Sequence, residues 1–321
     1  MENLVKELKK SPLFAMSLGS MELFHSNFWR WLMEQNKKYI SIFFNDFENI
    51  DSKDIQIARE YKHTYICIKY KNNYYIIENK IKSMLSEEQL QEYTESFTSK
   101  KETFVKGVYI FPLDINFLNN KLCNWSFMNY SKILSKITII TEEIKKEKDP
   151  SLNDSIIAII DEYVRMTKNL ICLMKHAIIH YDNTFICEED EIFEYLKELR
   201  IYDIVRKINC ELLKKKLEEK LKVAFPSSFN QINIISGFSH GHSSLSARWK
   251  IPFTDDEKDG YFLIGPQIEN NQFRTMIHIC CNYFGISNSK TITDKQRKAI
   301  YEAVKEEVFS LGEDYYLTNN V

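Results

Sequence analysis

The fold class of this 321-residue chain is decided by residues 74–80, which read Tyr74-Tyr75-Ile76-Ile77-Glu78-Asn79-Lys80. Just upstream, residues 66–69 alternate isoleucine with Cys67 and Lys69, and residues 71–73 have the Lys-Asn-Asn composition of a turn. Strand-forming residues on both sides of a short polar turn predict a β-hairpin. Residues 66–80 are therefore expected to form two strands joined by that turn.

A helix and a further strand are expected directly after this hairpin. The helix spans about Ser86 to Ser99, because Ser86 and Gln89 have the spacing of a capping box, which satisfies two backbone donors at a helix start. The strand spans Phe104 to Pro112. The order strand, strand, helix, strand is typical of an α/β core.

The rest of the chain alternates between helical and strand patterns. Apolar positions at three- and four-residue spacing predict helices over 2–38, 150–179, 188–223 and 293–309. A strand pattern returns from about residue 231. We therefore expect an α/β protein with additions on both sides of the core.

Breaks in these patterns divide the chain into three expected parts. Asp149-Pro150-Ser151 interrupts the pattern and can open a helix, because proline is well tolerated in a first helical turn. The parts are a core over 1–148, a helical region over 149–224 and a C-terminal α+β region over 225–321.

Composition and charge narrow the class of protein. The chain is 44% hydrophobic and 27% charged, which is ordinary for a globular protein. Its seven cysteines include no CxxC pair, and we expect them to be reduced in a cytoplasmic protein. The net charge of −2 argues against extensive nonspecific coating of DNA but permits a local basic groove. No apolar run reaches about 18 residues, so no membrane partner is expected.

Glu78 and Lys80 are the residues that carry chemistry in the predicted hairpin. They lie two apart in a strand, so their side chains share one face. Phosphodiester hydrolysis needs a metal ion to activate water and to stabilise the charge that develops on phosphorus. Glu78 can bind Mg²⁺ while Lys80 orients the attacking water. Asn79 points away, but its carbonyl oxygen is a candidate further ligand.

Two further segments surround the Glu-Asn-Lys motif. Residues 89–93, Gln-Leu-Gln-Glu-Tyr, follow in the predicted helix, and residues 22–32 place Glu22 and His25 on one side of the first helix. Together these segments resemble the PD-(D/E)xK nucleases over about residues 20–130. The likeness is closest to a bacterial branch, related to RecB-type nucleases, whose motif reads apolar-apolar-Glu-Asn-Lys-Ile.

The resemblance implies a restriction-endonuclease-like mixed sheet flanked by helices and an Mg²⁺- or Mn²⁺-dependent nuclease that acts on DNA. It also implies a place among bacterial defence functions, such as defence against phage. The residue roles that it implies are catalysis by Glu78, Lys80, Glu22 and His25, nucleic-acid binding by Gln89, Tyr93 and Lys82, and metal binding by Glu78, Asn79 and His25.

The chain departs from the family at the first acid of the motif. By register that position is Tyr65, and a slip of one residue selects Thr64; no Asp or Glu lies between Glu60 and Glu78. A phenol is neutral at pH 7 and a poor ligand for Mg²⁺.

Three explanations of this departure are open. The acid has migrated to Glu60 or Glu22; the protein is an inactive relative that binds nucleic acid, another protein or a second copy of itself; or Tyr65 is an inactivating change. The expected function is thus a nuclease scaffold whose activity is lost or rewired, with a non-catalytic regulatory protein as the alternative.

Overall fold

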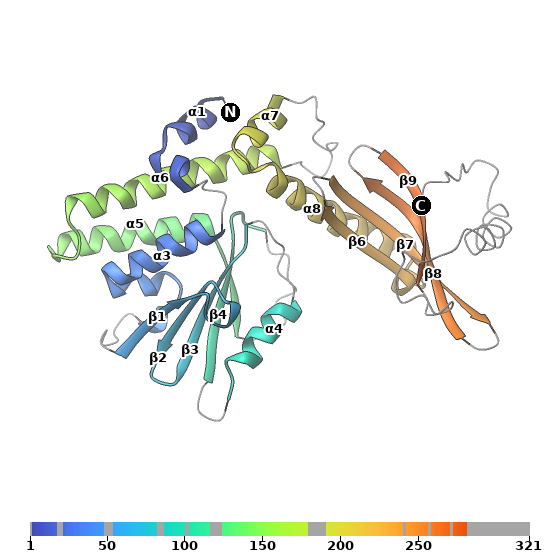
Figure 1. Ribbon diagram of the computed structural model, residues 1–321, viewed down its shortest axis with the longest axis horizontal. Coiled ribbons are helices and arrows are strands. Elements are labelled where there is room, and N and C mark those ends of the chain that lie inside the picture. Colours follow the sequence, from blue (N-terminus) through green and yellow to red (C-terminus); the bar gives the residue numbers. More distant parts are fainter. Residues whose placement is uncertain are drawn as a thin grey trace. The chain divides into compact units, whose positions relative to one another are not determined.

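The structure is a computed structural model that describes residues 2–17, 22–47, 54–81, 87–99, 103–115, 124–178, 191–239, 242–255, 258–269 and 272–280. The chain forms two compact units, Met1–Ile208 and Asn209–Val321 (Figure 1). The predicted last helix over 293–309, the predicted helix cap Ser86 and the predicted DNA contact Lys82 lie outside the described residues.

The first unit is built on a five-stranded mixed sheet in the order β1-β2-β3-β4-β5. Strands β1, β2 and β3 pair antiparallel, whereas β3, β4 and β5 pair parallel. The predicted mixed α/β class and the hairpin are confirmed. The strands are β1 (Ile55–Arg59), β2 (Ile66–Tyr70), β3 (Asn73–Asn79), β4 (Thr103–Phe111) and β5 (Trp125–Asn129).

Helices cover both faces of this sheet, with α4 on one face and α3 and α5 on the other (Figure 1). Alternation along β3 decides which side chains meet which helix. Tyr74 and Ile76 pack with Leu90 and Tyr93 of α4 in one buried cluster. The intervening Tyr75 turns the other way, towards Phe44. By the same alternation, Glu78 lies on the face of Tyr74 and Ile76, and Asn79 lies on the face of Tyr75.

The first unit contains more and shorter helices than the apolar spacing of the sequence predicted. The region 2–38 forms three helices, because Pro12 opens a new helix and the Ser11 hydroxyl accepts the Phe14 N–H at 3.2 Å. The bounds are α1 (Glu2–Lys10), α2 (Pro12–Ser17), α3 (Glu22–Gln35), η1 (Lys37–Ile42), η2 (Asn45–Phe47), η4 (Tyr61–His63), α4 (Glu87–Ser96), α5 (Tyr130–Lys146), α6 (Asp154–Ala177) and α7 (Glu191–Glu198).

The helical region predicted over 149–224 falls in both units. Helices α6 and α7 belong to the first unit, where Arg165 of α6 forms an ion pair with Glu7 of α1 at 3.0 Å. Helix α8 (Tyr202–Ala224) begins in the first unit and ends in the second.

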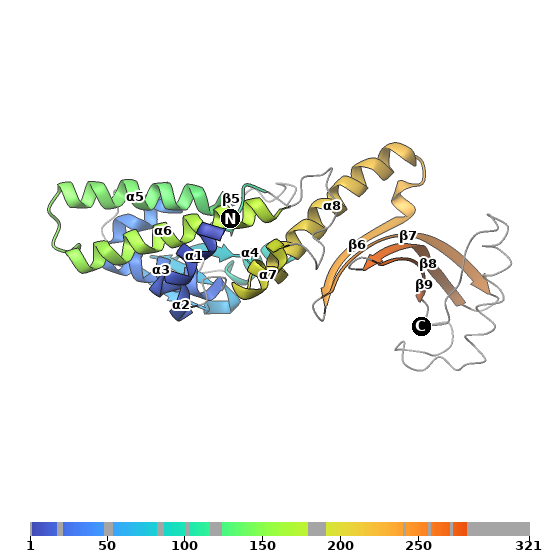
Figure 2. The ribbon, with the colours of Figure 1, turned by 90° about the horizontal axis from the view of Figure 1, so that it is seen from above.

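The second unit contains a four-stranded antiparallel sheet in the order β6-β7-β8-β9, seen beside α8 in Figure 2. The Cys210 thiol of α8 donates to the Ser244 carbonyl of β7 at 3.0 Å. The strand pattern predicted from residue 231 is therefore confirmed. The elements are η5 (Phe229–Gln231), β6 (Ile232–Ser239), β7 (His242–Asp255), β8 (Lys258–Glu269) and β9 (Gln272–Cys280). Within the described ranges, no helix combines the length and the apolar character needed to cross a membrane.

Candidate functional site

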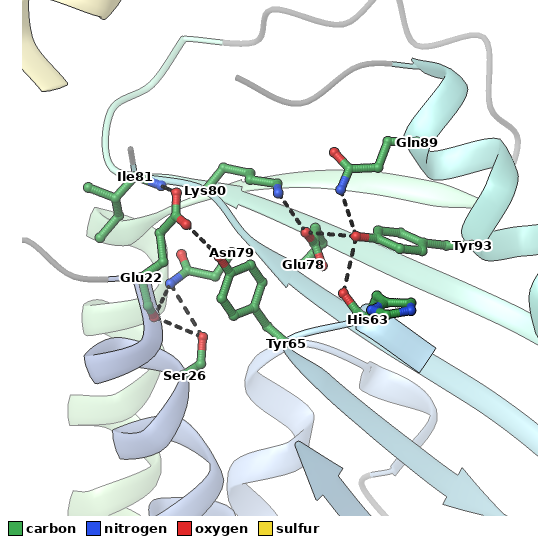
Figure 3. A network of polar contacts seen from close by, with 10 residues as sticks. All are labelled: Glu22, Ser26, His63, Tyr65, Glu78, Asn79, Lys80, Ile81, Gln89 and Tyr93. Carbon is green, nitrogen blue, oxygen red and sulfur yellow. Dashed lines mark hydrogen bonds and ion pairs between the residues drawn. The ribbon is translucent and has the colours of Figure 1, made fainter. Parts of the chain in front are cut away.

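Glu78 and Lys80 lie together at the carboxyl end of β3 (Figure 3). The Lys80 N–H donates to the Ile110 carbonyl of β4 at 2.9 Å, which extends the parallel pairing one residue beyond the strand. The Lys80 ammonium lies 3.0 Å from Glu78 Oε1, and the side chain of Glu78 is fully buried. The shared face predicted for Glu78 and Lys80 is thus what the structure shows.

Burial dominates the electrostatics of Glu78. Desolvation raises the pKa of its carboxyl from 4.5 to about 7, against the opposing charge of Lys80 and a main-chain hydrogen bond from Tyr65. The negative charge of Glu22 raises this pKa further. Among the described residues, Glu78 Oε2 has no hydrogen-bond partner. A buried carboxylate oxygen without a partner can accept a hydrogen bond or bind a cation.

Tyr65 is the residue at which the resemblance predicts the first acid of the motif. The pairing of Ile66 with Ile77 places Tyr65 beside Glu78, and the Lys80 ammonium lies 5.6 Å from the centre of the Tyr65 ring. Thr64 is buried and its hydroxyl donates to the Tyr61 carbonyl at 2.7 Å. Of the two residues, Tyr65 and not Thr64 therefore lies beside Glu78, while its correspondence to the first acid of the motif stays a prediction.

Glu22 reaches the same point from the first residue of α3. The Tyr65 hydroxyl donates to Glu22 Oε2, and the Ile81 N–H donates to Glu22 Oε1 at 2.7 Å. Burial and the carboxylate of Glu22 raise the pKa of the Tyr65 phenol, which keeps its proton on the oxygen. Both carboxylate oxygens of Glu22 are consequently held by donors of the protein.

Glu60, the other predicted replacement acid, lies in the turn that precedes Tyr65. Its side chain is exposed, and the backbone takes left-handed φ values of 51° at Glu60, 49° at Lys62 and 66° at His63. Such values are unfavourable for residues other than glycine, so this turn is strained. The turn presents the His63 carbonyl to the site, where it accepts the Tyr93 hydroxyl at 3.2 Å.

Helix α4 brings Gln89 and Tyr93 to Glu78. Gln89 Nε2 donates to the Tyr93 hydroxyl at 2.6 Å, and that hydroxyl lies 3.4 Å from Glu78 Oε1. Burial and the charge of Glu78 raise the pKa of Tyr93 to about 12. Tyr93 therefore borders the carboxylate and Gln89 holds the Tyr93 hydroxyl, while the contact of both residues with nucleic acid stays a prediction.

His25 lies in an aromatic cluster between helices. Its Nδ1 is 2.8 Å from the Tyr163 hydroxyl, its ring packs edge-on against Tyr130, and it is fully buried. Asn79 also uses its side chain away from Glu78, as alternation predicts, with its amide directed at α3 and at Tyr130. The metal roles predicted for His25 and for the Asn79 carbonyl stay predictions.

Comparison with family models, curated proteins and solved structures finds no match for this chain. The site is therefore interpreted from its own residues.

A divalent cation does not fit these residues as they lie. Within the part of the chain that the structure describes, no group of three His, Cys, Asp or Glu side chains is placed to hold a metal ion. Hard cations need several oxygen ligands, and with both oxygens of Glu22 held, Glu78 Oε2 is the carboxylate oxygen open at this point.

Sequence reasoning missed two residues of the site, Ser26 and Tyr130. The Tyr130 hydroxyl donates to Asn79 Oδ1 at 2.8 Å across a separation of 51 residues. Ser26 lies one turn after Glu22 and its hydroxyl donates to the Glu22 carbonyl at 3.0 Å. Neither residue belongs to a spacing motif, so nothing in the sequence marked them.

Proposed function

We propose that this chain is a PD-(D/E)xK-type DNA nuclease scaffold with a restriction-endonuclease-like first unit, in which Tyr65 keeps a metal-dependent site silent. The observation that carries the proposal is the meeting of Glu22, Tyr65, Glu78 and Lys80 at one strand end (Figure 3). These residues come from α3, from the start of β2 and from the end of β3. Tyr65 is the one among them without a charge.

The chemistry of the residues supports this proposal. Lys80 is held beside a buried carboxylate, where an ammonium group can orient a water molecule or contact a phosphate. Glu78 provides an open carboxylate oxygen in a site of low polarity, where electrostatic interactions are strong. A second carboxylate at position 65 would supply the charge that a hard divalent ion requires.

The decisive test is Tyr65→Asp. We expect this variant to gain Mg²⁺- or Mn²⁺-dependent cleavage of labelled duplex or single-stranded DNA, while the natural chain shows little or none. The gain should be at least tenfold, because removing a single electrostatic or acid-base group commonly changes rates by about a hundredfold.

The control for this test is Tyr65→Asp combined with Lys80→Ala, in which the gained activity should disappear. Circular dichroism establishes that each variant is folded. If folded Tyr65→Asp gains no cleavage with either metal, the proposal fails. If the natural chain is already fully active, Glu22 serves as the migrated acid and Tyr65 does not silence the site.

A second candidate function is binding of nucleic acid without cleavage. The absence of cleavage in this candidate is supported by the closure of Glu22 by Tyr65 and Ile81, which satisfies this carboxylate without any ion. Binding of DNA by the natural chain in the presence of EDTA tests this candidate directly. Affinity should fall steeply between about 50 and 200 mM salt, because binding to phosphates releases counterions.

A further inference from the structure

Asn79 joins three elements at the end of the sheet. It is the last residue of β3, and its side chain lies on the face opposite to Glu78, between α3 and the start of α5. Asn79 and Ser26 are 0% exposed and Tyr130 is 1% exposed. Buried polar groups of this kind are stable only when they are hydrogen-bonded to one another.

The partners of Asn79 fix the orientation of its amide. A main-chain carbonyl can only accept, so the amide nitrogen faces the Glu22 carbonyl, at 2.9 Å. The same nitrogen lies 3.5 Å from the Ser26 hydroxyl. This leaves the amide oxygen to accept the Tyr130 hydroxyl at 2.8 Å. The Glu22 carbonyl therefore determines which way the amide of Asn79 points, and the Tyr130 hydroxyl holds the amide at its oxygen.

The same end of β3 holds Glu22 twice. Asn79 holds its main-chain carbonyl, and the N–H of Ile81, two residues later, holds its carboxylate at 2.7 Å. Two anchors on one short segment fix both the start of α3 and the direction of the Glu22 side chain. The Ser26 hydroxyl also donates to this carbonyl, at 3.0 Å, but it belongs to α3 itself, so we expect loss of the Asn79 anchor to let the helix start shift and move the carboxylate away from Tyr65.

We propose that Asn79 and Tyr130 are positioning residues that hold Glu22 at the site through the start of α3. This inference rests on the proposed function in one respect, because it takes Glu22 to be an acid of that site. The placement of Glu22 by Asn79 and Tyr130 does not depend on nuclease activity. The middle residue of the Glu-Asn-Lys motif acts here through Glu22, on the far side of the sheet from its neighbours.

A role in stability alone is the competing explanation, and a second buried tyrosine separates the two. The Tyr39 hydroxyl is 2.8 Å from the Thr141 hydroxyl, and Tyr39 is 0% exposed. Thr141 lies eleven residues after Tyr130 in α5, roughly 16 Å along the helix axis. Tyr39→Phe therefore removes an equivalent buried hydroxyl at a place remote from Glu22.

The experiment compares Tyr130→Phe, Asn79→Leu and Tyr39→Phe in the full chain. Two NMR signals report on Glu22, namely the amide proton of Ile81 and the ¹³Cζ of Tyr65, since both groups donate to its carboxylate. We expect both signals to move in Tyr130→Phe and Asn79→Leu and to stay in place in Tyr39→Phe. The double variant Tyr130→Phe/Asn79→Leu should move them no further than Asn79→Leu, because Tyr130 acts on Glu22 through the side chain of Asn79.

A second measurement uses the Tyr65→Asp background and titration with Mn²⁺. There Tyr130→Phe should weaken Mn²⁺ affinity about tenfold, as the loss of a residue that orients a ligand commonly does, and Tyr39→Phe should not.

The outcomes separate the two proposals. If Tyr130→Phe lowers the melting temperature as Tyr39→Phe does but leaves both NMR signals unchanged, the positioning role is overturned. If the signals move as expected but Tyr65→Asp neither binds Mn²⁺ nor cleaves DNA, the positioning role stands and the proposed nuclease function is lost. Should Asn79→Leu not fold, Tyr130→Phe decides alone, because it removes a single hydroxyl.

Discussion

At the scale of single residues, Tyr65 changes what holds the site together. A carboxylate at this position would bring a third negative charge beside Glu22 and Glu78, with Lys80 as the opposing charge. The phenol instead donates a hydrogen bond to Glu22. Hydrogen bonds to charged groups contribute about 1.5 to 3 kcal/mol, so the site is stabilised in the absence of an ion.

Replacing this hydroxyl alone should therefore have two effects. We expect Tyr65→Phe to lower the free energy of unfolding by about 2 kcal/mol, because the Glu22 carboxylate loses a donor. We also expect Mn²⁺ to raise the melting temperature of Tyr65→Phe more than that of the natural chain, because Glu22 Oε2 becomes open. Equal Mn²⁺ effects in the two proteins would contradict this prediction.

The buried carboxyl of Glu78 predicts a pH-dependent stability. Its pKa is about 7 in the folded chain against an ordinary value of 4.5, so the folded state binds this proton more tightly than the unfolded state does. Its contribution to stability is complete below about pH 4.5 and is lost as the pH rises through 7, by about 3 kcal/mol.

We expect Glu78→Gln to remove this loss. The free energy of unfolding of the variant, relative to the natural chain, should rise between pH 5 and pH 8 in urea titrations. Glu92→Gln, on the exposed face of α4, is the matched control and should leave the pH dependence unchanged. If the difference in free energy of unfolding between Glu78→Gln and the natural chain were constant across this range, the raised pKa of Glu78 would be refuted.

At the scale of elements, packing between β4, β5 and α4 sets the place of Tyr93 beside Glu78. Trp125 of β5 lies over Gly107 of β4, and its indole N–H donates to the Thr94 hydroxyl of α4 at 3.0 Å. A Cβ added at Gly107 would lie 2.3 Å from the Trp125 ring. Glycine is required here by the close approach of the indole.

Gly107→Ala should lower the free energy of unfolding by about 1 to 3 kcal/mol, because the indole must move. The same change in a Trp125→Ala background should cost much less. Thermal unfolding of the four proteins of this cycle measures the coupling. Additive costs would show that Trp125 is not the residue in conflict.

At the scale of the whole molecule, the chain has two compact units, each with its own sheet. Multidomain chains frequently lose stability unit by unit rather than in a single transition. A Cβ at Gly265 of β8 would lie 1.9 Å from the Ala247 carbonyl oxygen of β7, a backbone atom that cannot rotate away.

Gly265→Ala should thus lower the hydrogen-exchange protection of β7 and β8 while β3 and β4 keep theirs. Gly107→Ala is the reciprocal control, with protection lost in the first unit and kept in the second. Mass spectrometry of exchanged peptides reads both units at once. Equal loss of protection in both units would mean that they unfold together.

Local pattern determined the framework that carries the candidate site. Strand alternation and turn composition predicted the hairpin of β2 and β3, and with it the shared face of Glu78 and Lys80. No strand was predicted over residues 125–129, which form β5. That segment is a strand because it pairs in parallel with β4, and this pairing forms only in the tertiary structure.

The sequence by itself determined that one carboxylate and one lysine share a strand end and that no Asp or Glu lies between Glu60 and Glu78. Only the tertiary structure decided what surrounds them: Tyr65 bonds to Glu22 across 43 residues, and Tyr130 to Asn79 across 51. Periodicity reports on neighbours three or four residues apart in a helix and two apart in a strand. Hydrogen bonds between distant segments depend on how the helices pack against the sheet, and no local pattern records that packing.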